Sequence, residues 1–371
     1  MTQTSAPVLS PPFLLATDGS PSAHLAQKLL ATIAQTIQAE PHDDGRSLVT
    51  VLTVQPRRSS RSRRLPSTRP PGIDQKPAPA AADHAPEAVA VAAQSLSVDD
   101  LTNASQTFPA GLSFTVETRQ GRPAIEILNC ARTLQAGLIA VGSRGTAKKR
   151  GRLMGSVSAV IARYAPCSVL VARGATVTPA AEPSLHHLLL VVNDAPATQQ
   201  AIAATRQLLS AGIRQLTILY AQQPLNADYL FGPFATPTPS WQLNQSLQEA
   251  QKEQGEAMLE QARAALSVPA IEVQTLRQTG DPGPLICQTA QQQQVDLIVL
   301  SGNAMQRWLH LPVSEGLFPL QPFRRSKPME AGVVEQPPAL RNTRLSAAED
   351  YTLHHAPCSV LLCRSMHTAS T

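Results

Sequence analysis

A nine-residue segment occurs twice in this chain, and this internal repeat constrains the fold more than any other feature. The segment reads APCSVLVAR at residues 165–173 and APCSVLLCR at residues 356–364, with identical residues at seven of nine positions. Three shorter pairs also match: FLLATDGSPSA with LLLVVNDAPAT, GRPAIEIL with GDPGPLIC, and GLIAVGSRG with VDLIVLSGN. The 371-residue chain is therefore expected to contain two copies of one unit, at residues 1–178 and 184–366.

Each copy alternates short apolar runs with helical segments, many of them alanine-rich, which is the pattern of an open, doubly wound α/β sheet. Near-continuous aliphatic runs indicate strands of a mainly parallel sheet that is covered on both faces. The expected strands are 13–17, 48–54, 112–118, 138–141 and 168–172 in the first copy, and 187–192, 215–220, 270–276, 296–300 and 359–362 in the second. The expected helices of the first copy are 22–38, 86–104, 123–135 and 156–164. The prediction is two tandem five-stranded α/β sheets.

Two insertions interrupt this pattern, at about residues 55–86 and 307–344. The first combines arginine, serine and proline, a composition that cannot bury enough apolar surface to offset the entropy lost on ordering. The second is rich in proline and carries the basic patch RRSK from Arg324. We expect the first insertion to be disordered and the second to be poorly ordered.

The net charge of +5 and the isoelectric point near 9.1 come from one short segment. Residues 57–69 hold six arginines and no acidic residue, so the rest of the chain is close to neutral. Seven Phe, four Tyr and two Trp are also too few for the stacking platforms that bind single-stranded nucleic acid. The charge is thus poor evidence for nucleic-acid binding by the folded body.

The sequence predicts a cytoplasmic protein without a transmembrane segment. Its start lacks the basic head and apolar run of a secretory signal, and its longest aliphatic run, 188–192, is too short to cross a bilayer. The five cysteines are odd in number and form no C-x-x-C pair, so we expect buried reduced thiols and neither disulfides nor a zinc site.

The most specific segment is LIAVGSRGTAKKRGRLMGSVS, residues 138–158, in which a buried strand leads through a basic loop into a helix. Its glycines, Gly142, Gly145 and Gly155, follow the spacing G-x-x-G-x9-G-S. The first two let the backbone approach an anion, and the helix that opens at Gly155 presents free N–H groups and the positive end of its dipole. We expect Ser156 to cap this helix and to offer its hydroxyl to a phosphate. No Gly-Lys-Ser/Thr sequence occurs, so this is not a Walker A loop.

At these residues the chain resembles the ATP-binding members of the universal stress protein family, whose phosphate motif has this G-x-x-G-x9-G-S/T spacing. The resemblance covers nearly the whole chain outside the two insertions. It implies an adenine nucleotide alpha hydrolase-like fold that binds ATP with Mg²⁺, with Thr17 and Asp18 at the nucleoside and Val54 in the adenine pocket. The other residues implied to hold the nucleotide are Val141, Gly142, Arg144, Gly145, Gly155, Ser156, Val157 and Ser158.

Some of these residues also fit a purely structural role. The sequence DGSP from Asp18 is typical of a turn and a helix start. A ligand at the carboxyl ends of strands nevertheless agrees with a doubly wound sheet, which favours the binding role. Five basic residues fit either neutralisation of a triphosphate or a solvated face: Arg144, Lys148, Lys149, Arg150 and Arg152.

The second copy departs from the motif. Its first strand ends in Asn193 and Asp194, and the sequence after Leu300 keeps Gly302 but loses the glycine spacing. The insertion separates that strand from the next helix, where RLSAAED stands, so we expect weak ATP binding or none in this copy. Asp296 occupies a position where family members usually carry aspartate, whereas the first copy has Gly137 there.

The repeated last strand, SVLVAR and SVLLCR, is apolar and would be hazardous as an exposed edge. In the family this strand pairs between protomers, which implies that the two copies pair with each other as an internal pseudo-dimer. Further assembly into a homo-oligomer is compatible with the sequence.

No catalytic set stands out, because the histidine pairs lack metal-ligand spacing and no nucleophile has a neighbouring base. The main hypothesis is a nucleotide-dependent regulator of stress response or signalling, with ATP held by the first copy. One alternative is an ATPase or nucleotidyl-transferring enzyme of the same fold group, and slow ATP hydrolysis alone is also compatible with the motif. Another is an interaction module whose Arg-rich loop binds acidic partners, RNA or anionic membrane.

Overall fold

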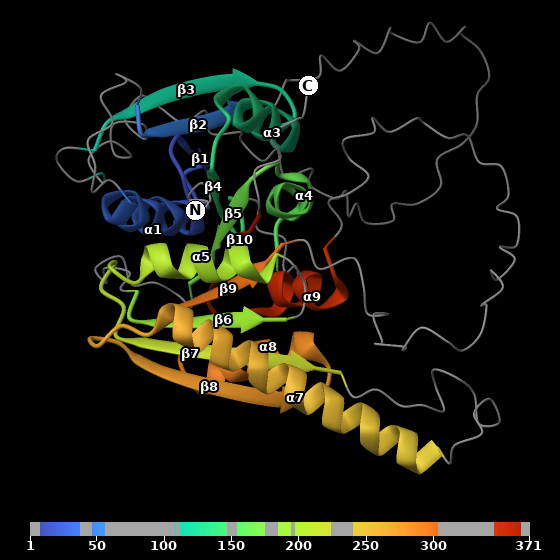
Figure 1. Cartoon of the computed structure of the whole chain (residues 1–371). Coiled ribbons are helices and arrows are strands. Elements are labelled where there is room, and N and C mark those ends of the chain that lie inside the picture. The colour runs from blue at the N-terminus through green and yellow to red at the C-terminus, as the bar shows by residue number, and fades with distance from the viewer. Residues whose placement is uncertain are drawn as a thin grey trace, which may run out of the picture.

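The structure is a computed structural model that describes residues 8–37, 47–55, 108, 112–146, 154–174, 185–193, 197–223, 240–302 and 345–364. The second insertion, the first beyond Gln55, and the helix expected at 86–104 lie outside the described residues. The described strands form one sheet with the order β3-β2-β1-β4-β5-β10-β9-β6-β7-β8 (Figure 1). The predicted α/β class with two related five-stranded units is therefore confirmed.

The first five strands form one half of this sheet, here called the first domain, and all its neighbouring strands are parallel. Its strands are β1 (Phe13–Thr17), β2 (Val49–Gln55), β3 (Phe114–Gln120), β4 (Leu138–Gly142) and β5 (Ser168–Ala172). Its described helices are α1 (Pro21–Ile37), α3 (Pro123–Leu134) and α4 (Ser156–Tyr164). Because β1 and β5 are continuous apolar runs, their ends match the prediction, whereas β3 begins two residues later than expected.

The second domain repeats this topology, again with parallel neighbours. Its strands are β6 (His187–Val192), β7 (Gln215–Gln222), β8 (Glu272–Thr279), β9 (Leu297–Ser301) and β10 (Ser359–Cys363). Its described helices are α5 (Thr198–Leu208), α7 (Ser240–Leu266), α8 (Pro282–Gln292) and α9 (Ala347–His355).

The two domains meet where the repeated nine-residue segments pair. Strands β5 and β10 run antiparallel, with Leu170 opposite Leu361, and residues of both strands are buried. This seam covers two apolar edges that would otherwise be exposed. The predicted internal pseudo-dimer is thus confirmed, and it turns two five-stranded sheets into one sheet of ten strands.

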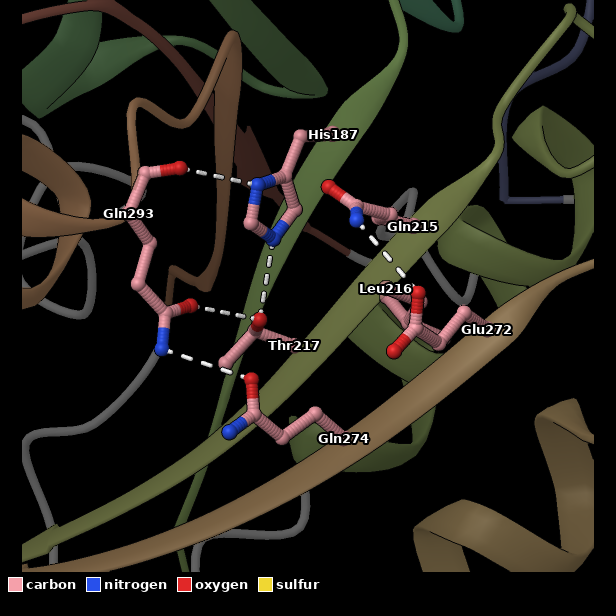
Figure 2. Close-up of a pocket in the computed structure, with 7 residues that line it drawn as sticks. All are labelled: His187, Gln215, Leu216, Thr217, Glu272, Gln274 and Gln293. Carbon is pink, nitrogen blue, oxygen red and sulfur yellow. Dashed lines mark hydrogen bonds between the residues drawn. The ribbon is translucent and has the colours of Figure 1, made fainter.

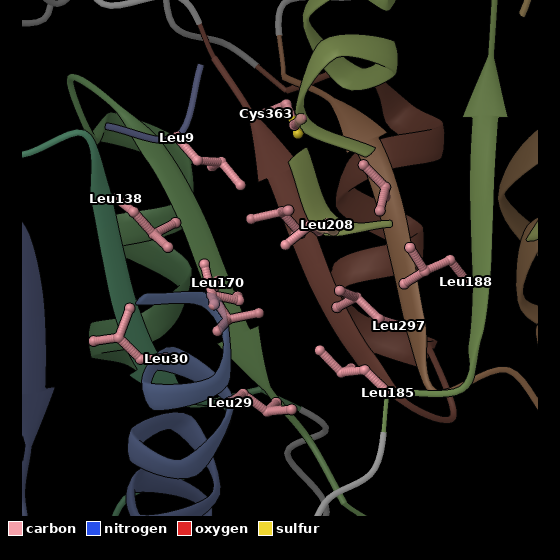
Figure 3. Close-up of a cluster of buried hydrophobic side chains, with 14 of the residues drawn as sticks. Leu9, Leu29, Leu30, Leu138, Leu170, Leu185, Leu188, Leu208, Leu297 and Cys363 are labelled. Atoms are coloured by element: carbon pink, nitrogen blue, oxygen red, sulfur yellow. The ribbon is translucent and has the colours of Figure 1, made fainter. Parts of the chain in front are cut away.

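Each face of the sheet carries one apolar cluster that continues across the seam. Helices α1, α5 and α7 cover one face, and α3, α4, α8 and α9 cover the other. Figure 3 shows the first cluster, which includes Leu30 of α1 and Leu208 of α5 together with Leu170 of the seam strand β5. Leu9 adds a polar link, because its N–H donates to Gln207 Oε1 of α5 at 3.0 Å and its carbonyl accepts from Gln207 Nε2 at 3.2 Å. The domains therefore share their cores.

All five cysteines are free, and four of them are buried, as the sequence predicts. Cys287 is half-buried and is the exception. Burial raises the pKa of Cys167 and of Cys358 to about 12, which keeps both thiols protonated at neutral pH. None of the described helices is long and apolar enough to cross a membrane.

Candidate functional site

The candidate site lies at the carboxyl edge of the first domain, where β1 and β4 end and α4 begins. Asp18 follows β1, and its carboxylate joins these elements. Its Oδ1 accepts the N–H of Ser20 at 3.1 Å, and its Oδ2 accepts the N–H of Thr146 at 3.1 Å. Asp18 therefore both closes the turn after β1, as the structural interpretation predicts, and holds the glycine loop that follows β4. Its contact with a nucleoside stays a prediction.

Two serines at the start of α1 also hold this loop, a contact that the sequence did not predict for either of them. Ser20 Oγ donates to the carbonyl of Arg144 at 3.0 Å, and Ser22 Oγ hydrogen-bonds to the same carbonyl. The N–H of Arg144 in turn donates to Ser22 Oγ at 3.3 Å. The Asp-Gly-Ser-Pro-Ser run after β1 predicts contacts with neighbouring backbone groups, whereas the Arg144 carbonyl lies more than 120 positions away in the chain. The Arg144 side chain itself is exposed.

The three motif glycines differ in what surrounds them. A Cβ on Gly142 would lie 2.5 Å from Ser22 Oγ and 2.7 Å from the backbone nitrogen of Ala23, and one on Gly145 would lie 2.6 Å from Asp18 Oδ2. Backbone atoms thus require glycine at position 142, whereas at position 145 a Cβ would meet only the carboxylate of Asp18. Within the part of the chain that the structure describes, a Cβ on Gly155 would meet nothing closer than Ser143 O at 3.4 Å, an ordinary contact. Packing alone therefore does not explain the third glycine.

Helix α4 begins without a side-chain cap. Gly155 is the N-cap residue, with φ −70° and ψ 150°, and its N–H donates to Ser143 O at 2.8 Å. The expectation that Ser156 caps the helix is wrong, because Gly155 takes the extended cap position and Ser156 is the exposed first helical residue. The first N–H groups of a helix have no intrahelical partner, so this end presents donors and the positive end of the dipole.

Two further motif residues fix the helix to the strand and to the core. Ser158 is buried and its Oγ donates to the carbonyl of Gly142 at 2.6 Å, which ties the first turn of α4 to the end of β4. Val157 is half-buried and packs on the cluster of the α4 face. Lys148, Lys149, Arg150 and Arg152 lie outside the described residues.

The remaining predicted residues lie on the strand ends with different orientations. Val54 packs against the cluster of the α4 face and is half-buried, so its side chain lies on the same side of the sheet as α4. Val141 is only 3% exposed in that cluster, which leaves its main chain as the part that can reach a ligand. Thr17 Oγ1 accepts the N–H of Gly19 at 3.3 Å. Opposite it in the β1–β2 register stands Thr53, a buried residue that sequence reasoning missed, whose hydroxyl has no partner among the described residues.

The corresponding helix start of the second domain is closed by its own side chains. Ser346 caps α9 by accepting the N–H of Glu349 at 3.2 Å, and Glu349 Oε2 accepts the N–H of Ser346 at 2.8 Å. Ser346 thus stands at the cap position of Gly155, and Glu349, only 5% exposed, places a buried carboxylate in the first turn, at the position of Ser158 in α4. Gly302, the glycine retained after β9, is the structural counterpart of Ser143 and not of Gly142. The N–H of Gly302 donates to the carbonyl of Cys363, and the N–H of Ser143 makes the equivalent bond to the carbonyl of Ala172.

Two cavities lie in the second domain. One, of about 420 Å³, is at the carboxyl ends of β7 and β8 beneath α7, and its lining is polar, with Lys252 and Arg277 as its cations. The other, of about 170 Å³, lies at the opposite, amino edge, where His187, Thr217 and Gln293 hydrogen-bond to one another (Figure 2). His187 Nδ1 lies 3.0 Å from Gln293 O, and its Nε2 lies 2.9 Å from Thr217 Oγ1. These side chains hydrogen-bond to one another, which indicates a structural role.

Asp296 also belongs to the amino edge. Its Oδ2 accepts the N–H groups of His186 and His187 at 2.8 and 2.9 Å. In the first domain Gly137 takes this place, and a Cβ there would lie 2.0 Å from the carbonyl oxygen of Ser10. The difference between the copies at this position thus concerns strand packing at the edge away from the candidate site. Among the described residues, no group of three or more His, Cys, Asp or Glu side chains is placed to hold a metal ion.

Several solved structures resemble the whole chain. A protein of Pseudomonas aeruginosa PAO1, described as functionally unknown, is 15% identical, with a TM-score of 0.53 and coverage of 95% of this chain and 92% of that chain. A putative universal stress protein from Pseudomonas aeruginosa UCBPP-PA14 is 14% identical, with a TM-score of 0.51 and coverage of 95% and 93%. A universal stress protein from Archaeoglobus fulgidus is 16% identical, with a TM-score of 0.49 and coverage of 95% of each chain.

At these identities the likeness to solved structures is one of fold. No curated protein matches the sequence. The family model described as the universal stress protein family matches two segments, residues 11–173 and 185–311, which together make up more than half of the chain. The repeated sequence, the repeated topology and the two matched segments agree, and the chain belongs to the universal stress protein family as a tandem of two domains.

Proposed function

We propose that this protein binds one adenine nucleotide, ATP with Mg²⁺, at the carboxyl edge of its first domain and acts as a nucleotide-dependent regulator of stress response or signalling in the cytoplasm. The observation that carries the proposal is the contrast between two equivalent helix starts. Helix α4 begins at an uncapped glycine, whereas α9 begins at a serine and a buried glutamate that satisfy each other.

The uncapped start of α4 suits a phosphate group. Backbone N–H groups and the dipole of a helix N-terminus both favour an anion. Gly155 adds no side chain there, and a Cβ at that position would collide with no atom of the described residues, so their packing does not require glycine. A ligand that approaches the backbone closely gives a reason for glycine at this position.

Positive charge at this edge also suits an anion. Arg144 lies in the loop after β4, and Arg173 follows β5. The pKa of Arg173 is lowered, first by burial and second by the positive charge of Arg144. Arg144 is thus the cation that we propose for the phosphate, whereas the Arg173 guanidinium is bound to the carboxyl end of α9.

The corresponding edge of the second domain is unsuited to a phosphate. Glu349 places a buried carboxylate at the first turn of α9 and already accepts a backbone N–H there. A phosphate at the same turn would face like-charge repulsion and would have to displace a satisfied cap. We therefore propose one nucleotide per chain at the helix N-termini, held by the first domain.

The test is titration calorimetry of the full chain with MgATP, with Gly155→Asp as the main variant. Asp is among the best N-cap residues and the backbone of Gly155 is extended, so this variant is expected to keep or increase the free energy of unfolding. Its carboxylate occupies the anion position, so MgATP affinity should fall by about tenfold or more.

Gly155→Ser is the matched control, because it also caps the helix but adds no charge. Its MgATP affinity should lie between those of the wild type and of Gly155→Asp. The wild type should bind one nucleotide per chain. No binding by the wild type, two equivalent sites, or equal affinities of the Asp and Ser variants would each refute the proposal.

A further inference from the structure

The arginine that ends each repeated segment crosses the seam and binds the other domain. Arg364 follows β10 of the second domain, and its guanidinium donates to the carboxyl end of α4 in the first domain. Nη1 donates to Ala165 O at 2.8 Å and Nη2 to Ala162 O at 2.6 Å. A cation on the last carbonyls of a helix satisfies acceptors that have no intrahelical partner, and it also opposes the negative end of the dipole.

Arg173 makes the equivalent contact from the first domain to the second. It follows β5 of the first domain, and its guanidinium donates to the carboxyl end of α9, at 2.7 Å to Leu353 O, 3.0 Å to His354 O and 2.8 Å to Ala356 O. Two serines of the seam strands form a second pair of equivalent contacts, with the backbone N–H groups of these arginines. Ser168 Oγ accepts the N–H of Arg364, and Ser359 Oγ accepts the N–H of Arg173, each at 3.1 Å.

The Arg364 side chain is buried, and the second domain leaves space for it. Arg364 is only 3% exposed, and a Cβ on Gly302 would lie 2.8 Å from its Cγ and 3.0 Å from its Nε. Glycine after β9 therefore makes room for the arginine that holds α4. Burial lowers the pKa of Arg364 to about 10, partly opposed by the nearby charge of Glu349, so the side chain stays cationic at neutral pH.

The two helices differ in how much they need this contact. Helix α9 has its own N-terminal cap from Ser346 and Glu349. Helix α4 has nine residues, a glycine cap without a side-chain hydrogen bond, and only three buried residues, Ser158, Ile161 and Ala162. A helix this short is marginal by itself, so its position depends on tertiary contacts. At its carboxyl end, beside the packing of Ile161 and Ala162 in the apolar cluster, two contacts come from the second domain: the Arg364 guanidinium and the Arg163–Asp350 ion pair at 2.6 Å.

We propose that Arg364 is a positioning residue for the ligand site of the first domain: by holding the carboxyl end of α4, it fixes where the amino end of α4 presents its N–H groups. The inference rests on the proposed function for the identity of the ligand. Nine helical residues span about 14 Å, so a rotation or slip at one end of the helix is transmitted to the other. The second domain, whose own helix start is closed, then serves as a built-in partner that keeps the first domain competent.

The test compares two variants that both keep the charge. Arg364→Lys and Arg173→Lys each replace a forked donor by a single ammonium that cannot bind the same carbonyls together. Hydrogen exchange of the full chain should show that Arg364→Lys speeds exchange of the α4 amides by about tenfold, the effect of losing about one hydrogen bond, and leaves α9 within about twofold. Arg173→Lys should speed exchange in α9 and leave α4 within about twofold.

Titration with MgATP is the second readout. Arg364→Lys should weaken binding by about tenfold, whereas Arg173→Lys, a variant of the same seam and the same charge, should change it by less than about threefold. Arg364→Met should weaken binding further than Arg364→Lys, and the lysine variant still tests the proposal where the methionine variant does not fold. Unchanged α4 exchange in Arg364→Lys, or equal MgATP affinities of the two lysine variants, would overturn the inference. If the wild type binds no MgATP, the proposed function is refuted. The hydrogen exchange of α4 then tests only whether Arg364 holds this helix.

Discussion

Alanine substitution of the three motif glycines should separate those that the fold requires from the one that the ligand requires. In Gly142→Ala the new Cβ would lie 2.5 Å from Ser22 Oγ and 2.7 Å from the backbone nitrogen of Ala23. That nitrogen is fixed in the first turn of α1 by its bond to Ser20 O at 2.9 Å. Either β4 or α1 must therefore move, and overpacking of this kind costs about 3 kcal/mol of the free energy of unfolding.

The other two variants should cost less, for different reasons. In Gly145→Ala the Cβ would meet Asp18 Oδ2 at 2.6 Å, a side-chain atom that can move if it gives up its bond to Thr146 N. The loss of that hydrogen bond costs about 1 kcal/mol. In Gly155→Ala the nearest atom is 3.4 Å away and the φ of −70° suits alanine, so only the weaker N-cap preference remains, at about 0.5 to 1 kcal/mol.

Urea denaturation followed by far-UV circular dichroism measures all three values. The expected order of destabilisation is Gly142→Ala, then Gly145→Ala, then Gly155→Ala. The last variant should nevertheless lose MgATP affinity, because its side chain enters the space assigned to the ligand. The reasoning is refuted if Gly155→Ala is as unstable as Gly142→Ala, or if Gly142→Ala is as stable as the wild type.

Two further predictions concern the shared core. Leu170 lies fully buried in β5 at the seam, so Leu170→Ala should lower the free energy of unfolding by about 3 to 4 kcal/mol. Because both apolar clusters cross the seam, calorimetry of this variant should still show one transition, and separate transitions for the two domains would contradict the shared core. Burial raises the pKa of Cys167 from 9.0 to about 12, so the stability linked to its proton is complete below pH 9 and is lost as pH rises toward 12. Between pH 8 and pH 10, Cys167→Ala should therefore lose about 1 kcal/mol less of the free energy of unfolding than the wild type, and an equal loss would contradict this linkage.

Much of the fold could be predicted from the sequence because its signals are local. The apolar runs of β1, β5 and β6 and the helix α4 were expected at the residues where the structure has them. The strands that differ, such as β3 and β8, are edge strands with alternating exposure, where the apolar run is weaker and the ends depend on pairing.

The candidate site was predicted less completely. The glycine spacing and Asp18 indicated which segments meet, since both follow strands of one parallel sheet. The roles of Ser20, Ser22 and Thr53 depend on contacts with other strands and loops, and a hydroxyl carries no sequence signal for such a contact. The Ser346-x-x-Glu349 pattern is a readable capping box, and it was the one local signal that would have identified the closed helix start of the second domain.

By itself, the sequence determined that the chain contains two copies of an α/β unit and that only one copy retains the glycine spacing, because repeats and spacings are properties of the chain order. Only the tertiary structure decided what the repeated arginines do. Arg364 meets α4 about 200 positions earlier in the chain, and the pairing of β5 with β10 brings them together. The same repeated segment therefore forms the seam and supplies, from each domain, the cation that holds a helix of the other.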